Sequence, residues 1–187
     1  RLCPSIDGTG GAVTVLGKLL NRHSGHQLRV LFVCTANICR SPLAEAILRE
    51  RAKAYQDRFL IKVDSCGVEA GPVPMPPDMR ARNVAQQRGV SLKGIKSRRL
   101  SEQDYFKYDV ILAMDSKHLA ALDESKPDAS TARIELFRQQ FETDQEVPDP
   151  YYGNSHGFER VFKLLLEATD HFLDETESHF EQLNTHC

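Results

Sequence analysis

The stretch Leu28–Glu45, LRVLFVCTANICRSPLAE, decides how this chain is organised. Leu28–Val33 is a mostly apolar, β-branched run of the length of a strand. Pro42 is typical of the first turn of a helix. We therefore predict that Cys34–Ser41 forms the turn that leads from a strand into a helix.

This turn is suited to holding an anion, because N–H groups and the positive end of the dipole meet at a helix N-terminus. The same surroundings, with a nearby cation, favour the thiolate of Cys34 over the thiol. Arg40 follows six residues later and can bind two oxygens of one phosphate with its planar guanidinium. We expect Ser41 to donate a hydrogen bond to the sulfur. We expect Asn37 to bond the backbone of the loop and to accept left-handed dihedral angles.

These groups together fit a tetrahedral dianion that is attacked by sulfur. Phosphoryl transfer depends mainly on positioning and on stabilisation of charge, so the pattern predicts hydrolysis of phosphate monoesters. A lone cysteine is more often a small buried apolar residue. The strand before the turn and the helix after it, with Asn37, Ser41 and Pro42 between them, make the catalytic interpretation the more specific one.

Val33–Pro42, VCTANICRSP, resembles the signature VCxGNICRSP of the low-molecular-weight protein tyrosine phosphatases. Asp149–Gly153 is similar to the DPYYG segment of that family, and the likeness takes in Val63-Asp64-Ser65 with Gly67, Val110–Asp115 and roughly Leu28–Leu173 in all. The resemblance implies a nucleophile at Cys34, phosphate binding at Arg40, a general acid at Asp149 and no cofactor. The substrate-binding residues that we assign on the same basis are Thr35, Ala36, Asn37, Ile38, Cys39, Ser41, Tyr151 and Tyr152.

Two features depart from the family pattern. Ala36 stands where the family usually has glycine, and its Cβ is expected to strain or reshape the loop. Glu69–Met75 contains none of the aromatic residues that often line the substrate cleft of the family.

Asp149 lies between Pro148 and Pro150, which stiffen the backbone and present its carboxyl group on a rigid loop. A carboxylic acid there could protonate the leaving oxygen of a tyrosine and then accept a proton from water. Tyr151 and Tyr152 could form an aromatic wall against the ring of phosphotyrosine. The alternative is that Asp149 only starts a turn.

The remaining pattern predicts an α/β fold with a single domain. Strands at 28–33, 60–64, 110–114 and 133–137 alternate with helical patterns, which favours a four-stranded parallel sheet with helices on both faces. The family resemblance implies the strand order 2-1-3-4. Ligands bind beyond the carboxyl ends of such strands, where Cys34 would lie.

We predict three segments along the chain. Residues 1–27 form a flexible N-terminal extension, residues 28–173 form the phosphatase domain, and residues 174–187 form a polar C-terminal tail that frays. Helices are expected at 42–55, 78–89, 101–106, 115–124 and 154–173, with Glu45 on a polar face, Asp78 and Asp115 as N-caps, and a turn at 65–67. His156, His171, His179 and His186 are expected at the surface.

The composition narrows the classes of function. The net charge of −2 gives no sign of nucleic-acid binding, and no apolar run could span a membrane. Five cysteines in a chain of this size favour free thiols in a reducing compartment, so we expect a cytoplasmic monomer. No spacing of Cys and His suggests a metal site. The phosphotyrosine of protein substrates is the expected partner.

The basic run from Arg80 to Arg99 is either a solvated face or a patch that attracts acidic sequences around a phosphorylated residue.

Other functions stay open at this stage. Arsenate reductases resemble the family but relay a disulfide through further cysteines, and none occurs between Cys66 and Cys187. Relatives that act on phosphoarginine carry a small polar residue at the position of Ile38. A further possibility is that the loop binds phosphorylated proteins without hydrolysing them. Cys39 could trap an oxidised Cys34 as a reversible disulfide, which would make the enzyme redox-sensitive.

Overall fold

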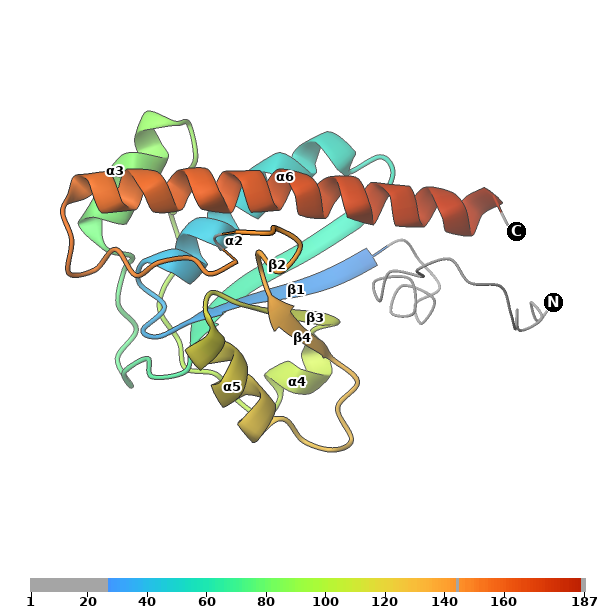
Figure 1. Ribbon diagram of the computed structural model, residues 1–187, viewed down its shortest axis with the longest axis horizontal. Helices are drawn as coiled ribbons and strands as arrows, with labels where there is room; N and C mark the ends of the chain where they lie inside the picture. Colours follow the sequence, from blue (N-terminus) through green and yellow to red (C-terminus); the bar gives the residue numbers. More distant parts are fainter. Residues whose placement is uncertain (1–26, 144, 186–187) are drawn as a thin grey trace.

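The computed structural model describes residues 27–143 and 145–185. Four parallel strands form one sheet in the order β2-β1-β3-β4, as predicted (Figure 1). The strands are β1 (Gln27–Cys34), β2 (Leu60–Gly67), β3 (Val110–Ala113) and β4 (Arg133–Leu136). The central strand β1 pairs with β2 over its whole length and with β3 from Val30 to Val33. The predicted extension, residues 1–27, lies outside the described residues except for Gln27.

The predicted turn at Ser65-Cys66-Gly67 was wrong, because these residues continue β2 and Cys34 pairs with Gly67. Beyond the strand end, the N–H of Val68 still bonds the carbonyl oxygen of Cys34 at 3.0 Å. Strand β2 therefore runs beside β1 up to Cys34, where the Cys34–Ser41 loop begins.

Helices cover both faces of the sheet (Figure 1). On one face lie α2 (Arg40–Arg51), the short helix η1 (Ala52–Tyr55), α3 (Met79–Gln87) and α6 (Ser155–Thr185). On the other lie α4 (Asp104–Lys107) and α5 (Ser116–Ser125). Asp78 and Asp115 cap α3 and α5 by accepting bonds from Arg80 N and His118 N, as predicted.

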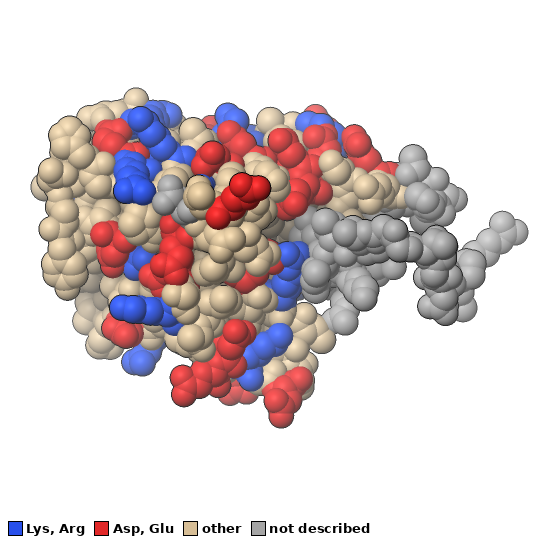
Figure 2. Space-filling model, in the orientation of Figure 1, with Lys and Arg blue, Asp and Glu red and all other residues tan. Residues whose placement is uncertain are grey.

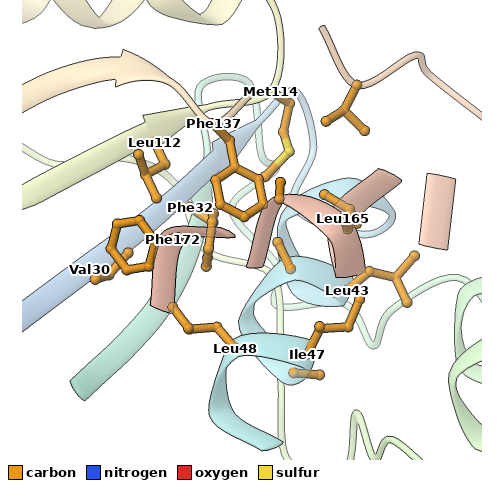
Figure 3. Packing of buried hydrophobic residues seen from close by; sticks show 14 of the residues in the cluster. Val30, Phe32, Leu43, Ile47, Leu48, Leu112, Met114, Phe137, Leu165 and Phe172 are labelled. Carbon is orange, nitrogen blue, oxygen red and sulfur yellow. The ribbon is translucent and has the colours of Figure 1, made fainter. Parts of the chain in front are cut away.

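Two apolar cores follow from the alternation of side chains along β1. Val30 and Phe32 point towards α2 and α6, where Phe32 meets Phe137 edge to face at 4.8 Å between ring centroids (Figure 3). Leu31 and Val33 point to the opposite face, against a cluster that contains Tyr105 and Leu122. Since both faces of β1 are buried, the position of Cys34 at its end is fixed by packing on each side.

The predicted end of the last helix at Leu173 was wrong, and residues 174–185 are not a fraying tail. Helix α6 runs from Ser155 to Thr185, because Thr176 and Phe180 continue its buried stripe at helical spacing. Phe180 stacks on Phe59 with ring centroids 5.1 Å apart. His179, expected at the surface, is buried beside it.

The surface carries mixed charges. On the face seen in Figure 2, Lys and Arg side chains alternate with Asp and Glu. Within the described residues, none of the helices is long and apolar enough to cross a membrane.

Candidate active site

The Cys34–Ser41 loop leaves the carboxyl end of the central strand and enters α2. Cys34 is 3% exposed, and its Sγ lies 3.0 Å from the Oγ of Ser41. Asn37 Nδ2 donates to the same Ser41 oxygen at 2.9 Å. The Ser41 hydroxyl accepts from Asn37, and its one hydrogen has two acceptors within reach, the sulfur at 3.0 Å and the carbonyl oxygen of Cys66 at 3.3 Å. The contact between Ser41 and the sulfur is thus present as predicted.

The curl of the loop depends on Asn37, which has a φ of 56°. Asn is one of the few non-glycine residues that tolerate this left-handed region. No other described residue except glycine has a positive φ, so Ala36 occupies the family's glycine position without backbone strain of that kind. Gly67 is required next to the loop, because a Cβ there would lie 2.5 Å from the carbonyl oxygen of Thr35.

The carbonyl groups of the loop are bonded on its outer side. Because a trans peptide points its N–H away from its C=O, the N–H groups of Thr35, Ala36, Cys39 and Arg40 are directed to the inner side. The carbonyl oxygens of Cys34, Thr35, Ile38 and Cys39 accept bonds from the N–H groups of Val68, Glu69, Asp78 and Leu43. The loop thus presents a lining of N–H groups suited to an anion.

The guanidinium of Arg40 is buried, at 3% exposure, and fixed from both sides. Its Nη1 donates to Asp115 Oδ2 at 2.7 Å and to the carbonyl oxygen of Val147 at 3.1 Å. Its Nη2 donates to Thr35 Oγ1 at 3.2 Å and to Asp149 Oδ2 at 3.0 Å. These bonds orient the guanidinium plane before any ligand binds.

His118 belongs to this arrangement and was not predicted. Its Nε2 lies 2.9 Å from Thr35 Oγ1, and its Nδ1 lies 2.8 Å from Asp115 Oδ1. Burial opposes ionisation of Asp115, but the bonds from His118 and Arg40 prevail and hold its pKa well below the usual range. Arg40, Asp115, His118 and Thr35 therefore form a closed ring of polar contacts. The available signal was a histidine three residues after a strand-end aspartate, on the inner side of a capped helix.

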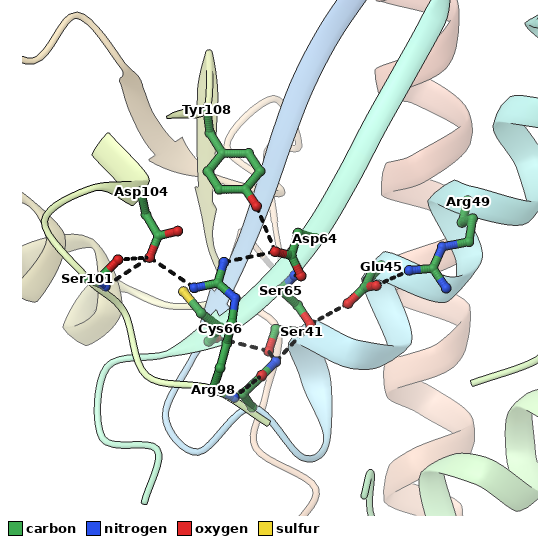
Figure 4. Close-up of polar contacts among 11 residues, drawn as sticks. Ser41, Glu45, Arg49, Asp64, Ser65, Cys66, Arg98, Ser101, Asp104 and Tyr108 are labelled. Carbon is green, nitrogen blue, oxygen red and sulfur yellow. Dashed lines mark hydrogen bonds and ion pairs between the residues drawn. The ribbon is translucent and has the colours of Figure 1, made fainter. Parts of the chain in front are cut away.

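A second polar network supports the loop from behind (Figure 4). Ser65 Oγ accepts from Asn37 Nδ2 at 2.8 Å and donates to Glu45 Oε2 at 2.5 Å. Glu45 also pairs with Arg49, and it is only 3% exposed, so its predicted place on the polar face of the helix was wrong. Burial raises the pKa of Glu45 although Ser65 opposes this. A charged residue in the apolar run LAEAIL was the signal that sequence reasoning passed over.

Arg98 holds the other side of the same network. Its backbone N–H donates to Asn37 Oδ1 at 3.0 Å. Its guanidinium bonds Asp64 at 3.0 Å and Asp104 at 2.9 Å, and Tyr108 donates to Asp64 as well (Figure 4). The left-handed Asn37 is thereby bonded through its whole side-chain amide.

Asp149 and the two tyrosines form the open wall of the site. Asp149 is 42% exposed in its side chain, and Tyr151 and Tyr152 are 44% and 93% exposed. Asp149 Oδ1 accepts from Tyr151 N at 3.0 Å, and Arg80 lies 5.7 Å from the centre of the Tyr151 ring. The rings of the two tyrosines meet edge to face at 5.1 Å.

One pocket of 280 Å³ joins most of the predicted residues. Asn37 and Ser41 do not line it; they lie behind the loop and are fully buried. The lining residues are Cys34, Thr35, Ala36, Ile38, Cys39, Arg40, Asp149, Tyr151 and Tyr152.

The cysteines near the site differ in chemistry. Burial, with smaller contributions from Asp78 and Cys34, raises the pKa of Cys39 to about 12. Burial also raises the pKa of Cys66 well above its usual value. Both remain thiols at neutral pH. Among residues 27–143 and 145–185, no group of His, Cys, Asp or Glu has the arrangement of a metal site.

A profile of the family described as low molecular weight phosphotyrosine protein phosphatase matches residues 29–184. The chain belongs to this family. A relative of that name from Schizosaccharomyces pombe is 40% identical over 149 residues, which cover 78% of this chain and 95% of the relative. Membership in this phosphatase family makes the chain a hydrolase, as the sequence predicts.

Solved structures of the phosphatase family share the fold. YfkJ from Bacillus subtilis is 34% identical, with a TM-score of 0.75 over 83% of this chain and 98% of that one. The drosophila arginine phosphatase is 31% identical, with a TM-score of 0.73 over 79% of this chain and 97% of that one. The same fold therefore occurs in relatives that are named for different substrates. The substrate specificity of this chain has to be argued from the residues of its pocket.

Proposed function

We propose that this enzyme hydrolyses phosphotyrosine in proteins through a phosphocysteine intermediate on Cys34. The observation that carries the proposal is that Cys34, Arg40 and Asp149 line one pocket of 280 Å³. Tyr151 and Tyr152 on its open wall offer flat apolar surface to an aromatic ester.

In the first step the Cys34 thiolate attacks phosphorus, and the bond from phosphorus to the tyrosine oxygen breaks. Asp149 gives its proton to that oxygen, so tyrosine leaves as a neutral phenol. In the second step water attacks the phosphocysteine, its proton passes to the Asp149 carboxylate, and the phosphorus–sulfur bond breaks. Inorganic phosphate leaves, and the thiolate returns with a hydrogen bond from Ser41.

Arg40 and the loop N–H groups stabilise the charge on the transferred group. Nη1 of Arg40 is held by Asp115 and by the Val147 carbonyl, so the Nη2 and Nε edge is the one that meets phosphate. The bond from Nη2 to Asp149 must then be exchanged for a bond to a phosphate oxygen. The carboxyl group of Asp149, released from Arg40, is then the group that supplies the proton in the first step.

The test is hydrolysis of p-nitrophenyl phosphate and of a phosphotyrosine peptide by the purified chain in the presence of a chelator. A phosphoarginine peptide of the same sequence is the matched alternative substrate. We expect a clear preference for phosphotyrosine, because Ile38 and the two tyrosines give the pocket apolar walls. A preference for phosphoarginine would contradict the proposed substrate, and phosphopeptide binding without turnover would contradict the enzymatic mechanism.

A further inference from the structure

A larger cleft lies next to the proposed active site, between the proline-rich segment 74–77, helix α3 and the segment 89–96. Its volume is 830 Å³. The charged residues that line it are Arg82, Lys93 and Lys96, and no carboxylate lines it. All three cations are exposed. The cleft therefore carries one sign of charge on a molecule with a net charge of −2.

These cations differ from their neighbours in the same basic run. Arg80, Arg88 and Arg98 each form ion pairs, with Asp78, with Glu159 and with both Asp64 and Asp104. In the part of the chain that the structure describes, Arg82, Lys93 and Lys96 have no ion-pair partner. The run thus contains two kinds of cation. Arg80, Arg88 and Arg98 are paired within the protein, whereas the charges of Arg82, Lys93 and Lys96 are available to a ligand.

Residues that adjoin the walls of the cleft along the chain are bonded to the Cys34–Ser41 loop. Asp78, next to the wall residue Pro77, donates its N–H to the carbonyl oxygen of Ile38 at 2.8 Å. Two residues after Lys96, the N–H of Arg98 donates to Asn37 Oδ1 at 3.0 Å. The loop that lines the small pocket is therefore bonded to residues one and two positions away from the cleft lining.

An apolar rim accompanies the cleft. Val73, Met75 and Met79 are exposed by 67%, 55% and 65%, and they lie within or close to the segment 74–77 that lines the cleft. Large apolar side chains gathered at the surface mark binding sites for other proteins. Methionine is adaptable in such contacts. Val73 and Met75 lie in Glu69–Met75, the stretch in which the sequence lacks aromatic residues.

We propose that the cleft of Arg82, Lys93 and Lys96 binds an acidic segment that flanks the phosphotyrosine of a protein substrate. The inference rests on the proposed function and specifies its substrate class. The phosphoryl group would occupy the 280 Å³ pocket while carboxylates a few residues away pair with the three cations. Each such pair is exposed and weak, but three of them favour the same ligand and also speed its association.

The test compares two phosphotyrosine peptides that differ only in flanking Asp and Glu against Asn and Gln. We expect kcat/KM to be about tenfold higher for the acidic peptide at low ionic strength and the difference to shrink in salt. The variant Lys93→Gln/Lys96→Gln should reduce the preference to about twofold. The control variant Lys62→Gln/Lys163→Gln removes the same charge from exposed sites outside the cleft and should keep the preference.

Hydrolysis of p-nitrophenyl phosphate, which is too small to reach the cleft, should be equal in all these proteins and reports on the proposed function alone. If no ester is hydrolysed, binding of the two fluorescently labelled peptides to the native chain still tests the cleft. Equal kcat/KM or equal binding of the two peptides would overturn the proposal. So would binding to vesicles containing phosphatidylserine that is lost in Lys93→Gln/Lys96→Gln while the peptide preference stays.

Discussion

The Cys34–Ser41 loop and the Asp149–Gly153 segment meet in one pocket but are held in different ways. In the loop, Cys34, Asn37, Arg40 and Ser41 are all buried, and two polar networks fix them from behind. In the segment, Asp149 and both tyrosines are partly or largely exposed, and few bonds hold them. Under the proposed mechanism, the phosphate-binding loop is therefore expected to be preformed, and the segment that carries Asp149 is expected to adapt to the substrate.

The largest effect is expected from Cys34→Ser. Loss of the thiolate should lower kcat by about 10⁴-fold or more, since a hydroxyl in the same place is a poor nucleophile. Binding of inorganic phosphate should persist, because the loop N–H groups and Arg40 remain. Steady-state hydrolysis of p-nitrophenyl phosphate measures the loss of turnover, and calorimetric titration with phosphate measures the binding. Cys66→Ala, which changes a buried thiol on the other face of the sheet, serves as the control and should stay active.

Asp149→Asn should lower kcat by about 10²- to 10⁴-fold, the range of general acid–base catalysis. The thermal midpoint should change by no more than about 2 °C, because the side chain is 42% exposed and exposed pairs contribute little. Glu146→Gln removes a neighbouring exposed carboxylate that bonds Ser116 N, and it should keep most of the activity. A large loss of stability in Asp149→Asn would show that the segment is as rigid as the loop.

His118→Ala tests whether the ring around Arg40 positions the guanidinium. We expect inhibition by phosphate to weaken about tenfold and kcat to fall by a similar factor, because Thr35 and Asp115 lose a shared partner. His118→Gln, whose amide can reach Thr35 Oγ1, should restore part of the phosphate affinity. If both variants lose only stability and keep phosphate affinity, His118 has no part in positioning.

The smallest effect concerns Cys39, which shares the pocket with Cys34. Since the pKa of Cys39 is raised to about 12, its thiol is protonated at pH 7 and becomes reactive only as the pH approaches that value. Iodoacetamide at pH 7 should therefore label Cys34 first, with Cys39 labelled slowly. Peptide mapping of the labelled protein reads this directly. Equal labelling of the two cysteines would contradict the difference.

The sequence predicted the fold and the loop well because both depend on local signals. An apolar strand, a motif of fixed spacing and a helix start lie within Leu28–Glu45, and the parallel arrangement follows from the alternation of strands and helices. The strand order came from the family resemblance. The roles of Cys34, Arg40 and Asp149 remain proposals that the geometry supports.

The sequence did not predict what depends on distant partners. Glu45 was placed on a polar helix face and His118 was not considered, and the burial of both comes with contacts to Ser65 and Thr35 that no local pattern encodes. The extension of α6 to Thr185 was missed for a similar reason. Its polar composition hid a stripe whose partner, Phe59, lies more than a hundred residues away in the sequence.

The most direct test of the mechanism is to trap the covalent intermediate. Asp149→Asn should slow release of phosphate from the sulfur, so acid quenching during turnover of p-nitrophenyl phosphate should leave a phosphoryl group on the peptide that contains Cys34. Mass spectrometry of the digested protein locates it. Phosphate on Cys34, absent in Cys34→Ser/Asp149→Asn, is the result that our account predicts. Phosphate on another residue, or turnover that continues without Cys34, would contradict it.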